Sequence, residues 1–182
     1  MSASTTKVDT LAYRKTIGLF ATGVTVVLAE RDGQIHGMTA NSVTSVSLEP
    51  TLVLVCPSKQ ANMSRYLTTP GAYYTINILG EDQELLSNYF ARWRGQDEPP
   101  SYRLIPWPAA GNVPRLDGCL GALACRVYRV YEGGDHWIVV GEVLDLYRSE
   151  RPQRPLLFFA GEYHQLRRQE PEHVPPSADP YR

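Results

Sequence analysis

The sequence predicts a mainly β fold, an antiparallel barrel with peripheral helices. About seven short runs are rich in β-branched, aromatic or other apolar residues, as buried strands are. Most of these runs are separated by tight turn signals, such as Glu30-Arg31-Asp32-Gly33. Strands and helices do not alternate along the chain, which argues against a doubly wound parallel sheet.

The expected strands are runs that end at turn residues: Val24–Ala29, Ile35–Thr39, Leu52–Cys56, Tyr73–Ile78, Ala122–Tyr131, Trp137–Tyr147 and Leu156–Phe159. The expected helices have a capping residue ahead of an apolar stripe: Asp9 or Thr10 to about Phe20, Ser58 to Leu67, and Glu81 to Ala91. Residues 92–114 contain five prolines and little periodicity, which indicates a long excursion over the surface.

Composition places the chain among single-domain globular proteins. It has 182 residues, of which 43% are hydrophobic and 20% charged, enough for one sizeable core. The formal net charge of −1 gives no electrostatic basis for binding nucleic acid or an anionic membrane. We expect a flexible leader at residues 1–8, one domain at 9–166, and a flexible, charged and Pro-rich tail at 167–182.

The cysteines and histidines give no pattern of a disulfide framework or a metal site. Cys56, Cys119 and Cys125 form no Cys-x-x-Cys pair and lie in apolar surroundings. They are expected to be buried free thiols, as in a reducing cytoplasm. The chain also lacks an apolar run near the roughly 18 residues that a membrane span needs.

The stretch Gly37–Lys59 is the main candidate for a binding site. Its first part is a polar strand of small residues, among them Thr39, Ala40, Asn41, Ser42 and Ser45, and an apolar strand follows. Small side chains let a flat ligand approach the backbone, whose N–H and C=O groups can then bind its edge. An amide such as Asn41 is disfavoured in a strand unless it finds partners, which the pyrimidine edge of a flavin would supply. The alternative is an ordinary polar edge strand.

Two shorter motifs add to this candidate site. Ser58-Lys59 follows an apolar strand at an expected helix start, where an anion would meet free N–H groups and an ammonium, with Arg65 two turns on. The alternative is a simple helix cap with a solvated lysine. His136, in Gly133-Gly134-Asp135-His136, is the one histidine at a rigid turn, although that motif alone is an ordinary hairpin turn. The aromatic pair in Leu156–Tyr163 is more often core than cofactor site.

Taken together, these motifs resemble the short-chain flavin reductase family. The resemblance rests on GMTANSVTSVSLEPTLVLVC, the GDH turn before Trp137, Gly141-Glu142-Val143, and PLLFFAGEY, and it extends from Leu11 to Leu166. It implies an antiparallel Greek-key split β-barrel of the FMN-binding type, usually a homodimer. Members use FMN or FAD and supply reduced flavin to a separate flavin-dependent monooxygenase.

The resemblance also implies roles for individual residues. Thr39, Ala40, Asn41 and Ser42 would hold the isoalloxazine edge and the ribityl chain. The route of the phosphates would be lined by Ser45, Ser58, Lys59, Asn62 and Arg65. Phe90, Ala91 and Arg92 would lie along the flavin. His136 would position NADH as the catalytic residue, and the nicotinamide would be covered by the segment containing Phe158, Phe159 and Gly161.

The expected function is transfer of hydride from NADH to free FAD or FMN, with FAD and NADH favoured. An alternative is a flavin-binding electron carrier or sensor on the same barrel that does not use NAD(P)H. The GDH turn and the PLLFF segment argue against it. A purely structural barrel would leave Asn41 and Lys59 without an explanation.

Overall fold

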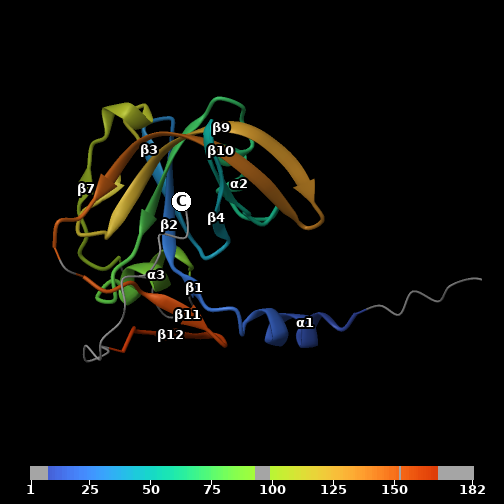
Figure 1. Cartoon of the computed structure of the whole chain (residues 1–182). Helices are drawn as coiled ribbons and strands as arrows, with labels where there is room; N and C mark the ends of the chain where they lie inside the picture. The colour runs from blue at the N-terminus through green and yellow to red at the C-terminus, as the bar shows by residue number, and fades with distance from the viewer. Residues whose placement is uncertain (1–7, 93–98, 152, 168–182) are drawn as a thin grey trace, which may run out of the picture.

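The computed structural model of the protein describes residues 8–92, 99–151 and 153–167. Its main element is one antiparallel sheet with the strand order β3-β2-β6-β9-β10-β5-β4 (Figure 1). The seven strands, in chain order, are β2 (Thr25–Arg31), β3 (Gln34–Ala40), β4 (Val43–Leu48), β5 (Thr51–Val55), β6 (Tyr73–Ile78), β9 (Gly121–Gly133) and β10 (His136–Arg148). The predicted antiparallel β architecture is therefore confirmed.

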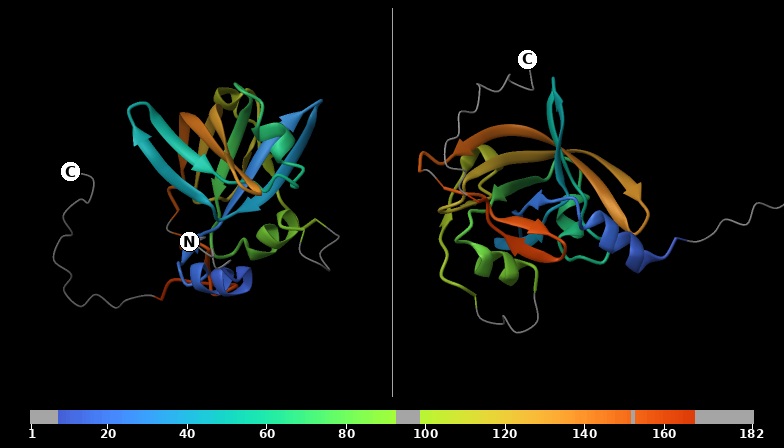
Figure 2. Two further views of the ribbon diagram at one scale, coloured as in Figure 1. Left: turned by 90° about the vertical axis from the view of Figure 1, so that its right-hand side faces the viewer. Right: turned by 60° about the horizontal axis from the view of Figure 1, so that its bottom comes forward.

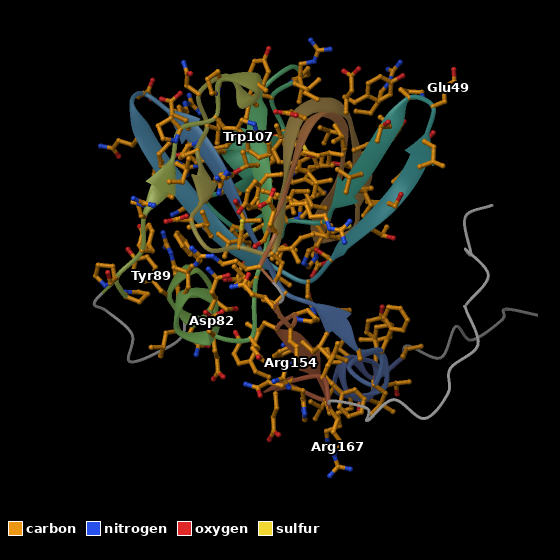
Figure 3. All side chains as sticks on the ribbon, turned by 60° about the vertical axis from the view of Figure 1, so that its left-hand side comes forward. Glu49, Asp82, Tyr89, Trp107, Arg154 and Arg167 are labelled. Atoms are coloured by element: carbon orange, nitrogen blue, oxygen red, sulfur yellow. The ribbon has the colours of Figure 1, made fainter. Side chains whose placement is uncertain are left out.

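The two edges of this sheet are consecutive in the chain. β3 forms one edge and β4 the other, and only Asn41-Ser42 joins them. The left view of Figure 2 shows the two edges converging toward this junction and diverging at their other ends. The sheet thus curls into a barrel that stays open along one side. Figure 3 places Glu49 at the outer tip of the β4–β5 hairpin, far from Asp82 and Tyr89 at α3.

Tight turns explain the two most regular hairpins. Asp32 and Gly33 have φ angles of 55° and 76°, and the turn pairs Arg31 with Gln34. Two consecutive residues with positive φ match the right-handed twist of the strands they join. In the longer β9–β10 hairpin, Gly134 has a φ of 71° and Gly133 pairs with His136.

Two small sheets flank the barrel. β1 (Thr22–Gly23), β11 (Leu157–Phe159) and β12 (Glu162–His164) form one, and β7 (Leu104–Ile105) and β8 (Arg115–Leu116) form the other. The segment before β8 also carries the 3₁₀ helix η1 (Pro108–Ala110). Trp107 is buried there and its indole N–H donates to Asp145 at 2.8 Å. The expectation that residues 92–114 run over the surface is wrong for this part, because it packs on the core.

The helices are shorter than the sequence predicts. They are α1 (Thr10–Ile17), α2 (Ser64–Leu67) and α3 (Glu84–Phe90). Asp9 caps α1 as expected, but Gly18 ends it well before Phe20. Ser58 does not cap α2, which begins six residues later. The backbone of Ser58 instead forms an isolated β-bridge with His136, a long-range pairing that local sequence does not reveal. No described helix is long and apolar enough to cross a membrane.

The core lies on both faces of the central strands. Val26 and Leu28 pack with one buried cluster, whereas Val27 and Ala29 pack with the other. This arrangement explains why four consecutive residues of β2, at positions 26–29, are apolar. Cys119 and Cys125 are buried free thiols, and Cys56 is half-buried. Burial raises the pKa of the Cys119 thiol to about 11 and that of Cys125 to about 12.

Candidate functional site

A cavity of about 320 Å³ opens at the junction of the two edge strands. Its lining residues come from β3, from the junction, from the segment after β5 and from the start of β10: Met38, Thr39, Ala40, Asn41, Ser42, Cys56, Pro57, Ser58, Ala61 and His136. Most of these side chains are small, so the cavity wall is largely backbone. That property suits a flat ligand bound by main-chain N–H and C=O groups.

The hydroxyls at the junction hold the wall together. Thr39 Oγ1 donates to the carbonyl of Ser87 in α3 at 2.6 Å. Ser42 Oγ accepts from the Cys56 N–H at 3.2 Å and lies 3.3 Å from the Cys56 carbonyl. These bonds fix the shape of the wall, and the assignment of Thr39 and Ser42 as cofactor contacts stays a prediction.

Asn41 differs from these neighbours. Its side chain is exposed at the cavity and has no hydrogen bond to another residue in the described part of the chain. A primary amide offers two donors and one acceptor oxygen. Asn41 is therefore available to bind a ligand edge that alternates donors and acceptors. It lies at the junction between β3 and β4, and not within a strand as the sequence analysis assumed.

The β9–β10 turn is held against the segment after β5, which also lines the cavity. The Lys59 N–H donates to the Asp135 carbonyl at 2.9 Å, and the Trp137 N–H donates to the Pro57 carbonyl at 2.9 Å. Ser58 and His136 pair between these two bonds. Two segments almost eighty residues apart thus form one continuous surface, which brings His136 to the cavity.

His136 is oriented by its neighbour Asp135. Its Nδ1 lies 2.8 Å from Asp135 Oδ1, and this hydrogen bond lowers the pKa of the Asp135 carboxyl. Because Nδ1 is occupied by a carboxylate, Nε2 is the ring nitrogen left for another partner. About 45% of the His136 side chain is exposed, so a reactant can approach it.

Lys59 is engaged outside the cavity. Its ammonium lies 3.2 Å from Glu132 Oε1 and 4.6 Å from the centre of the Trp137 ring. Ser58 Oγ accepts from the Gln60 N–H at 3.3 Å within a turn, not at a helix start. The predicted anion site at a helix N-terminus is therefore wrong in its geometry, although both residues stand at the cavity's edge.

The other predicted residues do not line the cavity. Ser45 is exposed on β4, Asn62 and Arg65 are exposed near α2, and Ala91 and Arg92 follow α3. The Phe90 ring lies over Gly37 of β3, one residue from the lining. Phe158, Phe159 and Gly161 belong to the β11–β12 hairpin, which packs beside α3.

Four lining residues were not predicted: Met38, Cys56, Pro57 and Ala61. Three of them fall inside the stretch Gly37–Lys59, so their position beside the predicted binding residues was the signal that could have identified them. A second hollow of about 710 Å³, lined by Tyr102, Arg103, Tyr147 and Arg148 among others, lies at the far end of β10. It contains none of the predicted residues, and we place the site in the smaller cavity.

Comparison with known proteins identifies the family. The flavin reductase like domain matches residues 17–167. An NADH-dependent flavin reductase from Rhodococcus sp is 41% identical over 163 residues, which cover 88% of each chain. The HsaB reductase subunit of a flavin-dependent monooxygenase from Mycobacterium tuberculosis is 35% identical over 175 residues, 94% of this chain and 88% of that one.

A solved structure agrees with this result in fold. The NADH:FAD oxidoreductase SgcE6 from Streptomyces globisporus, in complex with NAD and FAD fragments, superposes with a TM-score of 0.78 at 35% identity. The match covers 91% of this chain and 96% of that one. The resemblance that the sequence motifs indicate is confirmed, and the chain belongs to the family of proteins with a flavin reductase like domain.

Proposed function

We propose that the protein is an NADH-dependent flavin reductase that reduces free FAD or FMN and supplies the reduced flavin to a separate monooxygenase. The observation that carries this proposal is the cavity at Asn41-Ser42, which small residues of β3 and of the junction line together with His136. Family membership and the activities of two relatives, an NADH-dependent flavin reductase and a monooxygenase reductase subunit, support it.

The wall at Ala40–Ser42 fits the edge of a flavin ring. Its small side chains leave room for a flat ring, and the exposed Asn41 amide supplies donors and an acceptor. Backbone N–H groups and the Asn41 amide would stabilise negative charge at that edge. When bound, a flavin supplies the atom that accepts hydride, so the protein contributes geometry and needs no strong base.

Residues around the cavity are proposed to hold the remaining parts of the reactants. Ser58 is at the cavity and Lys59 beside it, close enough to contact a phosphate once the ammonium leaves Glu132. His136 is proposed to position NADH through its free Nε2. Phe90 and the β11–β12 hairpin are proposed to lie along the flavin and over the nicotinamide.

A flavin held in this way would be a co-substrate that binds with modest affinity and leaves after reduction. A steady-state assay that crosses FAD and FMN with NADH and NADPH tests the proposal. We expect NADH oxidation only when a flavin is added. No oxidation with any of the four pairs, or a tightly bound flavin that NADH does not reduce, would overturn it.

We propose further that the protein acts as a homodimer in the cytoplasm. α1 has eight residues and none of them is buried, and helices this short are marginal in isolation. The side chains of Leu11 and Phe20 are 59% and 73% exposed, and α1 stands beside the barrel (Figure 1). On the projecting β4–β5 hairpin, Leu48 is 75% exposed. A second copy that covers these surfaces is the simplest partner.

Light scattering on purified protein checks the dimer. The chain mass is 20.4 kDa, and we expect twice that value in solution. Leu11→Asp should shift the mass toward one copy, because a buried unpaired carboxylate is costly. A wild-type protein that runs as one copy at all concentrations would contradict the proposal.

A further inference from the structure

The hydroxyl of Tyr163, on β12, meets α3 at a buried position. Tyr163 OH lies 2.8 Å from Ser87 Oγ, and either hydroxyl can donate. Ser87 is fully buried. A hydroxyl in such a place is expected to have a partner, because an unpaired one carries its full desolvation cost.

Ser87 also contacts the cavity wall, through its backbone. Its carbonyl accepts the hydrogen bond from Thr39 Oγ1 at 2.6 Å, and Thr39 lines the cavity. One residue of α3 therefore touches β12 through its side chain and β3 through its carbonyl. Two hydrogen bonds, joined through Ser87, therefore connect Tyr163 to Thr39 in the cavity wall.

Tyr163 in turn carries the rest of its hairpin. Its ring packs edge-to-face against Phe158, with 5.5 Å between ring centres, and the two residues are paired across β11 and β12. Phe158 also pairs with Thr22 of β1. At the tip, the Ala160 N–H donates to the Gly18 carbonyl at 2.8 Å. The hairpin is thus held at its tip by a backbone bond, along β11 by the pairing with β1, and on the side of α3 by the Tyr163 side chain.

We propose that Tyr163 is a positioning residue, which fixes the β11–β12 hairpin against α3 and so against the cavity wall at Thr39. The inference rests on the proposed function, in which this hairpin covers the nicotinamide. Hydride transfer requires the two rings at a fixed separation, and a misplacement of about 1 Å can lower the rate by roughly two orders of magnitude. A hairpin free to move on α3 would not hold that separation.

The first test needs neither flavin nor activity. Hydrogen–deuterium exchange is measured at the amides of residues 157–164 in flavin-free protein, for wild type, Tyr163→Phe, Ser87→Ala and the double variant. Local opening of a small hairpin should speed about fivefold when one net hydrogen bond is lost. We expect each single variant to show this increase and the double variant to show no more, because both remove the same bond.

The matched control is Tyr131→Phe, which removes the hydroxyl of an exposed tyrosine on β9 and should leave exchange unchanged. Unchanged exchange in Tyr163→Phe, or additive increases in the double variant, would overturn the proposed link.

The second test separates positioning from a merely structural role. In Tyr163→Phe we expect kcat for flavin reduction to fall about fivefold, because the two rings are held less well, while the dissociation constant for flavin stays within about twofold of wild type. A wild-type protein that reduces flavin while Tyr163→Phe keeps the wild-type kcat would refute the inference alone. A wild-type protein that never oxidises NADH would refute the proposed function, and with it the role of Tyr163 in the reaction.

Discussion

The aromatic ring of Phe90, at the end of α3, lies directly on the backbone of Gly37 in β3. A β-carbon built at Gly37 would overlap Phe90 Cε1 and Cδ1 and would lie 3.0 Å from Leu28 Cδ2. Gly37 is one residue before the cavity lining, so the absence of its side chain lets α3 approach the sheet beside the site. The glycine serves close packing here, because it has no positive φ.

Gly37→Ala is expected to push Phe90 and the end of α3 away from β3. Overpacking of this kind lowers the free energy of unfolding by about 1–3 kcal/mol. Flavin affinity should fall as well, since α3 supports Thr39 and Phe90 lies beside the cavity. Thermal unfolding and a flavin fluorescence titration measure the two effects. In a Phe90→Ala background, Gly37→Ala should cost less stability than it does in wild type, because the ring is no longer there to overlap. An equal cost in both backgrounds would mean that the ring is not what the new methyl group meets.

Asn41→Ala tests the exposed amide at the junction. The side chain makes no hydrogen bond within the described residues, so its removal should leave the melting temperature unchanged. Loss of one or two hydrogen bonds to a ligand should weaken flavin binding about tenfold. Equal flavin affinity in the variant and wild type would show that the ring does not lie along Asn41.

The sequence predicted the parts of the fold that local pattern controls. Tyr73–Ile78 has the predicted bounds because its aromatic and β-branched residues are typical of strands, and the Asp32-Gly33 turn has an unambiguous signal. Pairings between distant segments were not predictable. Ser58 looked like a helix cap, but the β9–β10 turn provides its backbone partner. β12 is three residues long and was missed, because its register depends on β11 and not on its own sequence.

The sequence predicted part of the candidate site, as it predicted part of the fold. Asn41 and His136 both line the cavity, since the stretch Gly37–Lys59 and the rigid turn were visible locally. The sequence did not reveal that the hydroxyls of Thr39 and Ser42 bond to other parts of the protein. A residue type does not reveal which of its possible partners lies closer, and Ser87 is 48 residues from Thr39.

Glu132→Gln is expected to release Lys59 for a phosphate. The pair is 3.2 Å long but largely exposed, so its removal should change stability by no more than about 1 kcal/mol. Affinity for FMN should rise about threefold, whereas riboflavin, which has no phosphate, should bind as to wild type. Lys59→Met should weaken the binding of FMN and leave the binding of riboflavin unchanged. Equal effects of either substitution on the binding of FMN and riboflavin would show that Lys59 does not contact the phosphate.

The rate at which Cys56 is alkylated can show whether a ligand occupies the cavity. Its thiol lines the cavity, and burial raises its pKa, which lowers the thiolate fraction at pH 8 and slows alkylation. Cys119 and Cys125 are fully buried and should react only on unfolding, so they are internal controls. We expect iodoacetamide to modify Cys56 slowly in free protein and several-fold more slowly with excess FAD, measured by mass spectrometry. Identical rates with and without FAD would place the flavin elsewhere.

His136→Ala tests which reactant His136 contacts. His136 lines the cavity together with Asn41, and its Nδ1 is held by Asp135, which leaves Nε2 for a ligand. A partner lost at Nε2 should raise the KM for NADH about tenfold and leave flavin binding within about twofold. Asp135→Asn keeps a partner for Nδ1 but removes the carboxylate, so its effect on KM should be smaller than that of His136→Ala. The steady-state assay gives the KM for NADH, and the flavin titration gives the dissociation constant for flavin. Weaker flavin binding with an unchanged KM for NADH would show that His136 contacts the flavin and not NADH.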